Sequence, residues 1–143
     1  GTEPEAGVDI EPNTNNDDVK NIIIENLYTF NNAKRGLLMV FDNLIGNKEK
    51  NINMIVNKHK DYGSDIALEF FVDRGFKKIP DNKLAGNIII NNLNYQNNSK
   101  APIATNSGKR RNINLGLKNV VFVDKKKKKY KLTTKKIKSF QNL

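Results

Sequence analysis

Short apolar segments, separated by polar stretches rich in Asn, Lys and Gly, run through the whole chain. The longest of them, residues 36–41, has the length of a β-strand and is bounded by turn-forming residues. No apolar run approaches the roughly 20 residues that a membrane-spanning helix needs, so we expect no membrane span. A chain of 143 residues with 37% hydrophobic content predicts one domain with a modest core.

The spacing of the apolar residues predicts helices and strands in alternation. Strands are expected at 35–43, 76–79 and 101–105, and helices at 61–74, 81–95 and from 133 or 134 to 140. Residues 19–30 favour a helix, with a strand at 22–24 as the alternative. Two short strands, 119–123 and 130–132, flank a lysine-rich turn and predict a β-hairpin. We detect no internal repeat. This order predicts an α/β fold in which helices flank a mainly parallel sheet.

Charge divides the chain into an acidic start and a basic end. Residues 1–16 are polar and acidic and predict a disordered leader, which leaves 17–143 as a single domain. The net charge is +10, and Asp124 is the only acid after residue 100. Such an end suits an acidic protein, a nucleic acid or an anionic membrane surface. The candidate polyanion-binding residues are Lys109, Arg110, Arg111, Lys125, Lys126, Lys127, Lys128, Lys129 and Lys131. We interpret the excess of Asn as a sign of AT-rich coding DNA, viral or invertebrate.

The absence of cysteine and the single histidine exclude several kinds of chemistry. Without cysteine, the chain holds no disulfide, no thiolate zinc site and no cysteine nucleophile. One histidine excludes a multi-histidine metal site, and we expect neither a metal nor a cofactor. His59 lies in a polar stretch before a predicted helix and is expected to be a solvated surface residue.

Four segments, in consistent order over about 110 residues, carry a resemblance to the large subunit of caspases. Residues 28–43 match that family's first strand, with Arg35 and Gly36 before the apolar run. Residues 59–76 match the helix that follows, and 81–95 match the second helix. The last match is VVFVDKKKKKYKLTTKKIKSF, which is similar to the family's hairpin and final helix. The resemblance implies a caspase-like sheet without the strands of the small subunit, and therefore with an exposed edge that needs a partner, a second copy or a cap.

The residues that caspase chemistry needs are replaced or missing in this chain. By the resemblance, Ser107 stands where the family has its catalytic histidine, and Asn57 where it has an arginine that binds the substrate aspartate. Neither residue performs those roles, because a serine is no base near neutral pH and an asparagine carries no positive charge. The cysteine segment lies beyond Leu143. We therefore expect a chain that is not an enzyme.

The sequence supports three functional hypotheses. The first is a non-catalytic caspase-like decoy or regulator of apoptosis, cytoplasmic, whose partner is a caspase, a caspase-associated protein or a second copy of itself. The second is a basic nucleic-acid-binding domain that uses residues 109–138. The third is a small basic nuclease or toxin, whose acid–base chemistry would use His59 or, in principle, Lys, Arg, Asp and Tyr side chains.

Overall fold

The fold consists of strands stacked into parallel sheets. The computed structural model describes residues 5–44, 50–71, 84–106, 113–123 and 129–137. The strands in these ranges are Ala6–Ile10 (β1), Ile22–Glu25 (β2), Tyr28–Phe30 (β3), Arg35–Val40 (β4), Lys50–Asn57 (β5), Lys60–Tyr62 (β6), Ile66–Phe71 (β7), Leu84–Gln96 (β8), Ala101–Asn106 (β9), Ile113–Val123 (β10) and Lys129–Ile137 (β11). Within this part of the chain the only helical element is one 3-10 turn, Asp42–Leu44 (η1).

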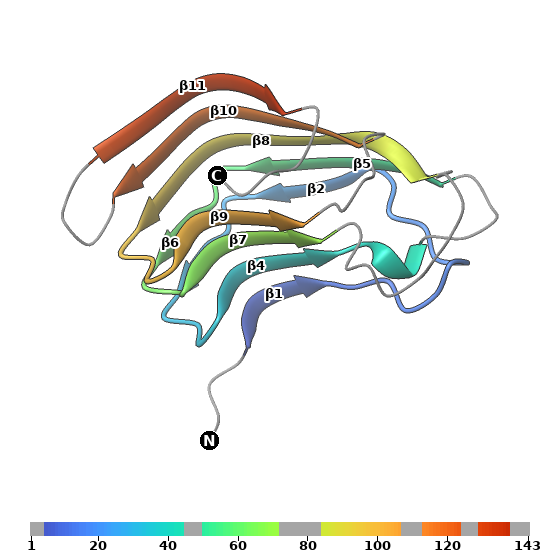
Figure 1. Cartoon of the computed structure of the whole chain (residues 1–143), viewed down its shortest axis with the longest axis horizontal. Coiled ribbons are helices and arrows are strands. Elements are labelled where there is room, and N and C mark those ends of the chain that lie inside the picture. The colour runs from blue at the N-terminus through green and yellow to red at the C-terminus, as the bar shows by residue number, and fades with distance from the viewer. Residues whose placement is uncertain (1–4, 45–49, 72–83, 107–112, 124–128, 138–143) are drawn as a thin grey trace.

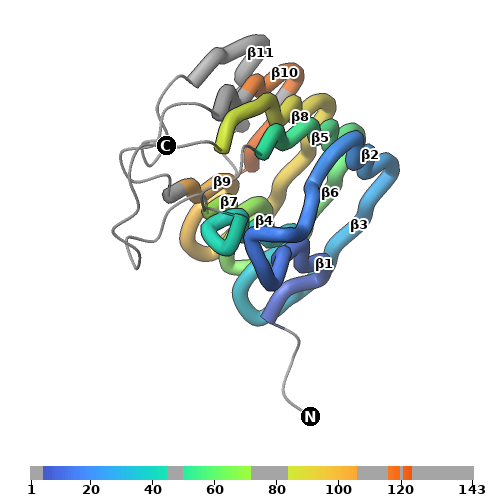
Figure 2. Tube along the Cα trace, turned by 90° about the vertical axis from the view of Figure 1, so that its right-hand side faces the viewer, coloured from blue at the N-terminus to red at the C-terminus, as the bar shows by residue number. Residues whose placement is uncertain are grey.

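Successive strands wind into coils that stack on one another (Figures 1 and 2). The first sheet has the order β1-β4-β7-β9, and a second sheet has the order β2-β5-β8-β10-β11. β3 and β6 belong to this second sheet as a short branch, in which β3 pairs with β6 and β6 pairs with the C-terminal half of β8. Every pairing is parallel except β10 with β11. The chain returns to the first sheet after 29, 31 and 35 residues, from Ala6 to Arg35, Ile66 and Ala101. This arrangement defines a parallel β-solenoid.

The register reveals a repeat that we did not detect in the sequence. The pairs Ile22↔Met54, Met54↔Ile88 and Ile88↔Leu115 align four ten-residue segments without a gap. These segments are NIIIENLYTF, NMIVNKHKDY, NIIINNLNYQ and NLGLKNVVFV, each beginning with Asn and a row of apolar residues. They start at residues 21, 53, 87 and 114.

Asparagine has a structural use at the corners of the coils. The sixth residue of each segment, Asn26, Lys58, Asn92 and Asn119, has φ between 53° and 56°. This left-handed conformation is unfavourable for most side chains but accessible to Asn. Between coils, Asn119 Nδ2 donates to Asn92 Oδ1 at 3.1 Å, and Asn92 Nδ2 donates to Asn57 Oδ1 at 2.9 Å. The asparagines at the coil corners therefore have a structural role, whatever the base composition of the gene.

The core lies between the sheets. At each inward-facing position, the equivalent side chains of successive coils lie next to one another and form a buried row. In the first sheet the rows include Leu37 with Leu68 and Met39 with Phe70, all at most 1% exposed. In the second sheet, Met54 and Ile88 are neighbours and fully buried. Gly86 (φ 136°) allows β5 and β8 to approach, because a Cβ there would overlap the Ile52 carbonyl oxygen.

The prediction of a mainly parallel sheet is confirmed, and the flanking helices are wrong. The segments expected as helices at 61–74 and 81–95 contain β6, β7 and β8, and the helix expected from 133 or 134 falls on β11. At 19–30 the alternative strand is correct, as β2. β7 has four consecutive buried residues, and periodicity does not separate such a run from a buried helix. In β8 the buried positions alternate with more exposed ones, but the exposed Ile89 lies between Ile88 and Ile90 and hides the alternation.

Two further expectations have clear outcomes. The hairpin is confirmed, since β10 and β11 pair antiparallel with Phe122 opposite Tyr130. The disordered leader is wrong for residues 6–10, which form β1 and pair with β4. The strand expected at 76–79 lies outside the described residues. No helix in the described ranges is long and apolar enough to cross a membrane.

Candidate binding face

Three aromatic side chains gather on the outer face of β3 and β6. Tyr28, Phe30 and Tyr62, the aromatic platform, are 63%, 54% and 40% exposed. The ring centroids of Phe30 and Tyr62 are 5.6 Å apart with an interplanar angle of 15°, and those of Tyr28 and Phe30 are 6.3 Å apart at 27°. Near-parallel rings at these separations are offset, because face-to-face contact would bring them within about 4 Å. Part of each ring face therefore stays open to solvent.

Polar side chains continue the same face onto the next coil. Register places Lys60 between Tyr28 and Asn94, and Tyr62 between Phe30 and Gln96. Lys60 is exposed, and Gln96 Nε2 donates to Asn94 Oδ1 at 3.1 Å. Two parallel rows of side chains thus cross the stacked strands, each from an aromatic residue to an amide. One row is Tyr28, Lys60 and Asn94, and the other is Phe30, Tyr62 and Gln96.

A buried polar network lies directly under the aromatic platform. Thr29 and Asp61 alternate with the platform residues and point inward, so both are at most 5% exposed. The Asp61 carboxylate accepts from Thr29 Oγ1 at 2.6 Å, from Ser64 Oγ at 2.7 Å and from Asn98 Nδ2 at 2.7 Å. Three donors satisfy a buried carboxylate, which would otherwise be costly to bury. The network fixes the strands that carry the exposed rings.

His59 completes the network in a defined tautomer. Because Thr29 gives its only hydroxyl proton to Asp61, it accepts from His59 Nε2 at 2.9 Å. In the neutral ring, Nδ1 then accepts the Tyr95 hydroxyl proton at 3.0 Å. Burial lowers the pKa of His59 to about 4, against a smaller opposing effect of Asp61. Burial also raises the pKa of Tyr95 well above its ordinary value.

This geometry corrects our expectation for His59. The side chain is fully buried and is not a solvated surface residue. Its Nε2 is a donor and its Nδ1 is occupied by Tyr95, so neither nitrogen is available to take a proton from a substrate. His59 therefore has a structural role here, and the nuclease hypothesis loses this residue as its candidate base.

Gly36 makes room for the network. It lies in β4, and a Cβ at this position would overlap Asp61 Oδ1 and come within 2.7 Å of Thr29 Oγ1. The register neighbours of this position in the adjacent coils are also small, Gly7 and Ala67. A column of small residues therefore borders the polar network along the solenoid.

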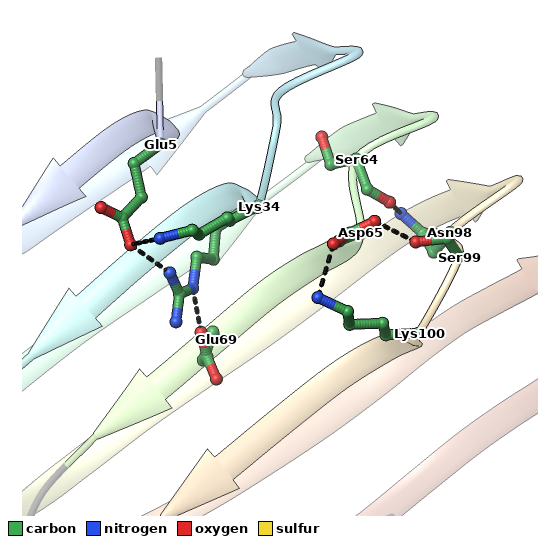
Figure 3. A network of polar contacts seen from close by, with 9 residues as sticks. Glu5, Lys34, Ser64, Asp65, Glu69, Asn98, Ser99 and Lys100 are labelled. Carbon is green, nitrogen blue, oxygen red and sulfur yellow. Dashed lines mark hydrogen bonds and ion pairs between the residues drawn. The ribbon is translucent and has the colours of Figure 1, made fainter. Parts of the chain in front are cut away.

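A second polar network ties the first sheet together at its edge (Figure 3). Glu5 accepts from Lys34 Nζ at 2.9 Å and pairs with Arg35, which also pairs with Glu69. The hydrogen bond from Lys34 is the main reason that the pKa of Glu5 is lowered. In the next turn Asp65 pairs with Lys100 at 2.7 Å. These contacts join neighbouring coils. The cationic groups of Lys34, Arg35 and Lys100 are all paired with carboxylates.

The residues singled out from the sequence are not brought into one site. Asn57 ends β5, where its Nδ2 donates to Glu25 Oε1 at 3.2 Å. Ser107, Lys109, Arg110, Arg111 and Lys125 to Lys128 lie outside the described residues. Lys129 and Lys131 belong to β11 by their backbone. The polyanion site therefore remains a prediction. Among the described residues, no group of three or more His, Asp or Glu is arranged to hold a metal ion.

Sequence reasoning missed the aromatic platform. It placed Tyr28 and Phe30 in one predicted helix (19–30) and Tyr62 in another (61–74), so it had no reason to place them together. The signal was the ten-residue repeat, in which Phe30 and Tyr62 occupy the same tenth position. Comparison with known proteins adds no family: no family model, curated protein or solved structure matches the chain.

Proposed function

We propose that this chain is a non-catalytic binding module and that the aromatic platform is its binding surface. The observation that carries the proposal is the exposure of three clustered aromatic rings on a sheet face. Soluble proteins seldom leave such side chains clustered in water without a use, and aromatic residues are enriched where proteins bind partners. The hydrogen-bonded network beneath the platform favours binding, since a rigid surface loses little conformational freedom when it associates.

The burial of the single histidine supports a non-catalytic role. The chain contains one histidine and no cysteine, and that histidine is buried and neutral. The Thr29 and Ser64 hydroxyls, which could be nucleophiles, are buried and donate to Asp61. A catalytic nucleophile needs an adjacent base that can accept its proton and access to the substrate.

A caspase or caspase-associated partner remains a proposal that rests on the sequence resemblance alone. The helices that the resemblance implied are strands here, so the fold adds no support to it. A pull-down with purified active caspases tests it, using the intact chain and the Phe30→Ala variant. Binding by the intact chain that the variant loses would support a caspase partner at the platform. Equal binding by both would place the contact elsewhere.

A further inference from the structure

Resting on the proposed binding role of the platform, we propose that its ligand is single-stranded nucleic acid. Proteins that bind single strands without strong sequence preference combine aromatic rings, on which bases stack, with positive charges that track the phosphates. A sheet face that carries exposed aromatics can stack two or three bases in this way. Tyr28, Phe30 and Tyr62 supply that stacking surface at 40–63% exposure.

The charges around the platform suit a polyanion. Lys60 lies within the platform rows, and Lys58 is exposed in the turn that precedes it. Neither lysine makes an ion pair with a described residue, whereas Lys34 and Lys100 pair with Glu5 and Asp65. Asp61, next to Lys60 in the chain, is buried and accepts three hydrogen bonds from the network, and Glu25 accepts from Asn57. The lysines at the platform are therefore available for phosphate, in a chain whose net charge is +10.

The amide side chains add a third element. Asn94 and Gln96 continue the two rows of the platform and are partly exposed. Amides donate and accept hydrogen bonds, so they can pair with the edges of bases that are splayed out on the neighbouring rings. Duplex nucleic acid offers no unstacked bases, so it would gain only the lysine contacts. The platform should therefore prefer single strands.

Fluorescence anisotropy with labelled oligo-U and oligo-dT tests the proposal at several salt concentrations. We expect Phe30→Ala and Tyr62→Ala each to weaken binding about 10-fold or more, with little change in salt dependence. Lys60→Ala should weaken binding and reduce the slope against log salt by about one. Phe30→Tyr keeps the ring and should bind like the parent chain. All three substituted side chains are exposed, so the variants should fold, and thermal unfolding of each will establish this.

Matched controls separate the platform from general surface charge. Ile23 is an exposed apolar residue on β2, and Lys118 is an exposed lysine on β10. Ile23→Ala should not change oligonucleotide affinity, and Lys118→Ala should change it less than Lys60→Ala. An unlabelled duplex should compete weakly with the single strand.

Three outcomes would overturn the inference. If Phe30→Ala and Tyr62→Ala bind as the parent does, while replacing Lys125–Lys128 with serine abolishes binding, the lysine run alone holds the nucleic acid. If no oligonucleotide binds even at low salt, the ligand class is wrong. The proposed function then survives only if a protein partner is lost with Phe30→Ala. If no ligand of either class responds to the platform variants, both proposals fail.

Discussion

His59 is enclosed by Thr29, Tyr95 and the coils around them. It is the only histidine in the chain, so its imidazole titration can be measured without signals from other histidines. Its depressed pKa means that the unfolded chain binds a proton between about pH 6.5 and pH 4 while the folded chain does not. Stability from this residue is therefore present above pH 6.5 and is lost as the pH falls toward 4.

Two measurements check this prediction. Nuclear magnetic resonance of the imidazole carbon should give one titration with a midpoint near pH 4. Urea unfolding should show a loss of about 3 kcal/mol from His59 between pH 7 and pH 4, on top of the loss due to carboxyl groups. His59→Gln, which can still donate and accept, should lack that contribution. A histidine midpoint near 6.5 would contradict the burial described here.

Gly36 provides a second test at the scale of one residue. Gly36→Ala places a methyl group against Asp61 and Thr29, and we expect it to cost about 2–3 kcal/mol in urea unfolding. Gly116→Ala is the matched control, because the nearest atom to its Cβ would be the Ile88 carbonyl oxygen at 4.0 Å. Equal stability of the two variants would mean that the network tolerates displacement.

At the scale of the elements, the corner at the sixth position of each ten-residue segment depends on left-handed residues. Three of the four equivalent corners have Asn, and the fourth has Lys58 at φ 56°. The left-handed conformation costs an ordinary residue about 1–2 kcal/mol. Lys58→Asn should therefore stabilise the chain by up to about 1 kcal/mol, measured by urea unfolding. Lys60→Asn, at an exposed strand position, is the control and should not stabilise.

Individual strands were partly predictable, but the winding that joins them was not. The apolar run at 35–43 and the hairpin around the lysine run gave β4, β10 and β11, because short runs between turn residues have few alternatives. Residues 61–74 and 81–95, which contain β7 and most of β8, were predicted as helices, since their apolar residues also fit helical spacing. The decisive information was the recurrence of Asn at 21, 53, 87 and 114, which only the repeat connects.

The candidate site was less predictable than the strands. Tyr28 and Tyr62 are more than 30 residues apart in the sequence, and only the coil register brings their strands together. His59 looked solvated because its neighbours Lys58 and Lys60 are polar. In a strand or tight corner, alternation turns such neighbours outward and the residue between them inward.

At the scale of the whole molecule, each coil is covered by the next, and among the described strands β1, β2 and β3 each pair with a strand on one side only. Ile22 in β2 is partly buried, whereas Ile88, in the same inward-facing row, is fully buried. We expect Ile88→Ala to cost about 2–5 kcal/mol and Ile22→Ala clearly less. Chemical denaturation measures both, and a larger loss for Ile22→Ala would contradict the stacking of the coils.

Because the hydrogen bonds between coils run along the solenoid axis, a force applied along that axis meets them one after another. The load would be carried in series, so the molecule should yield in steps, each releasing one coil of about 30 residues, or about 10 nm of chain. A protein of this kind is stiff against bending across its sheets and weak against being drawn out lengthwise.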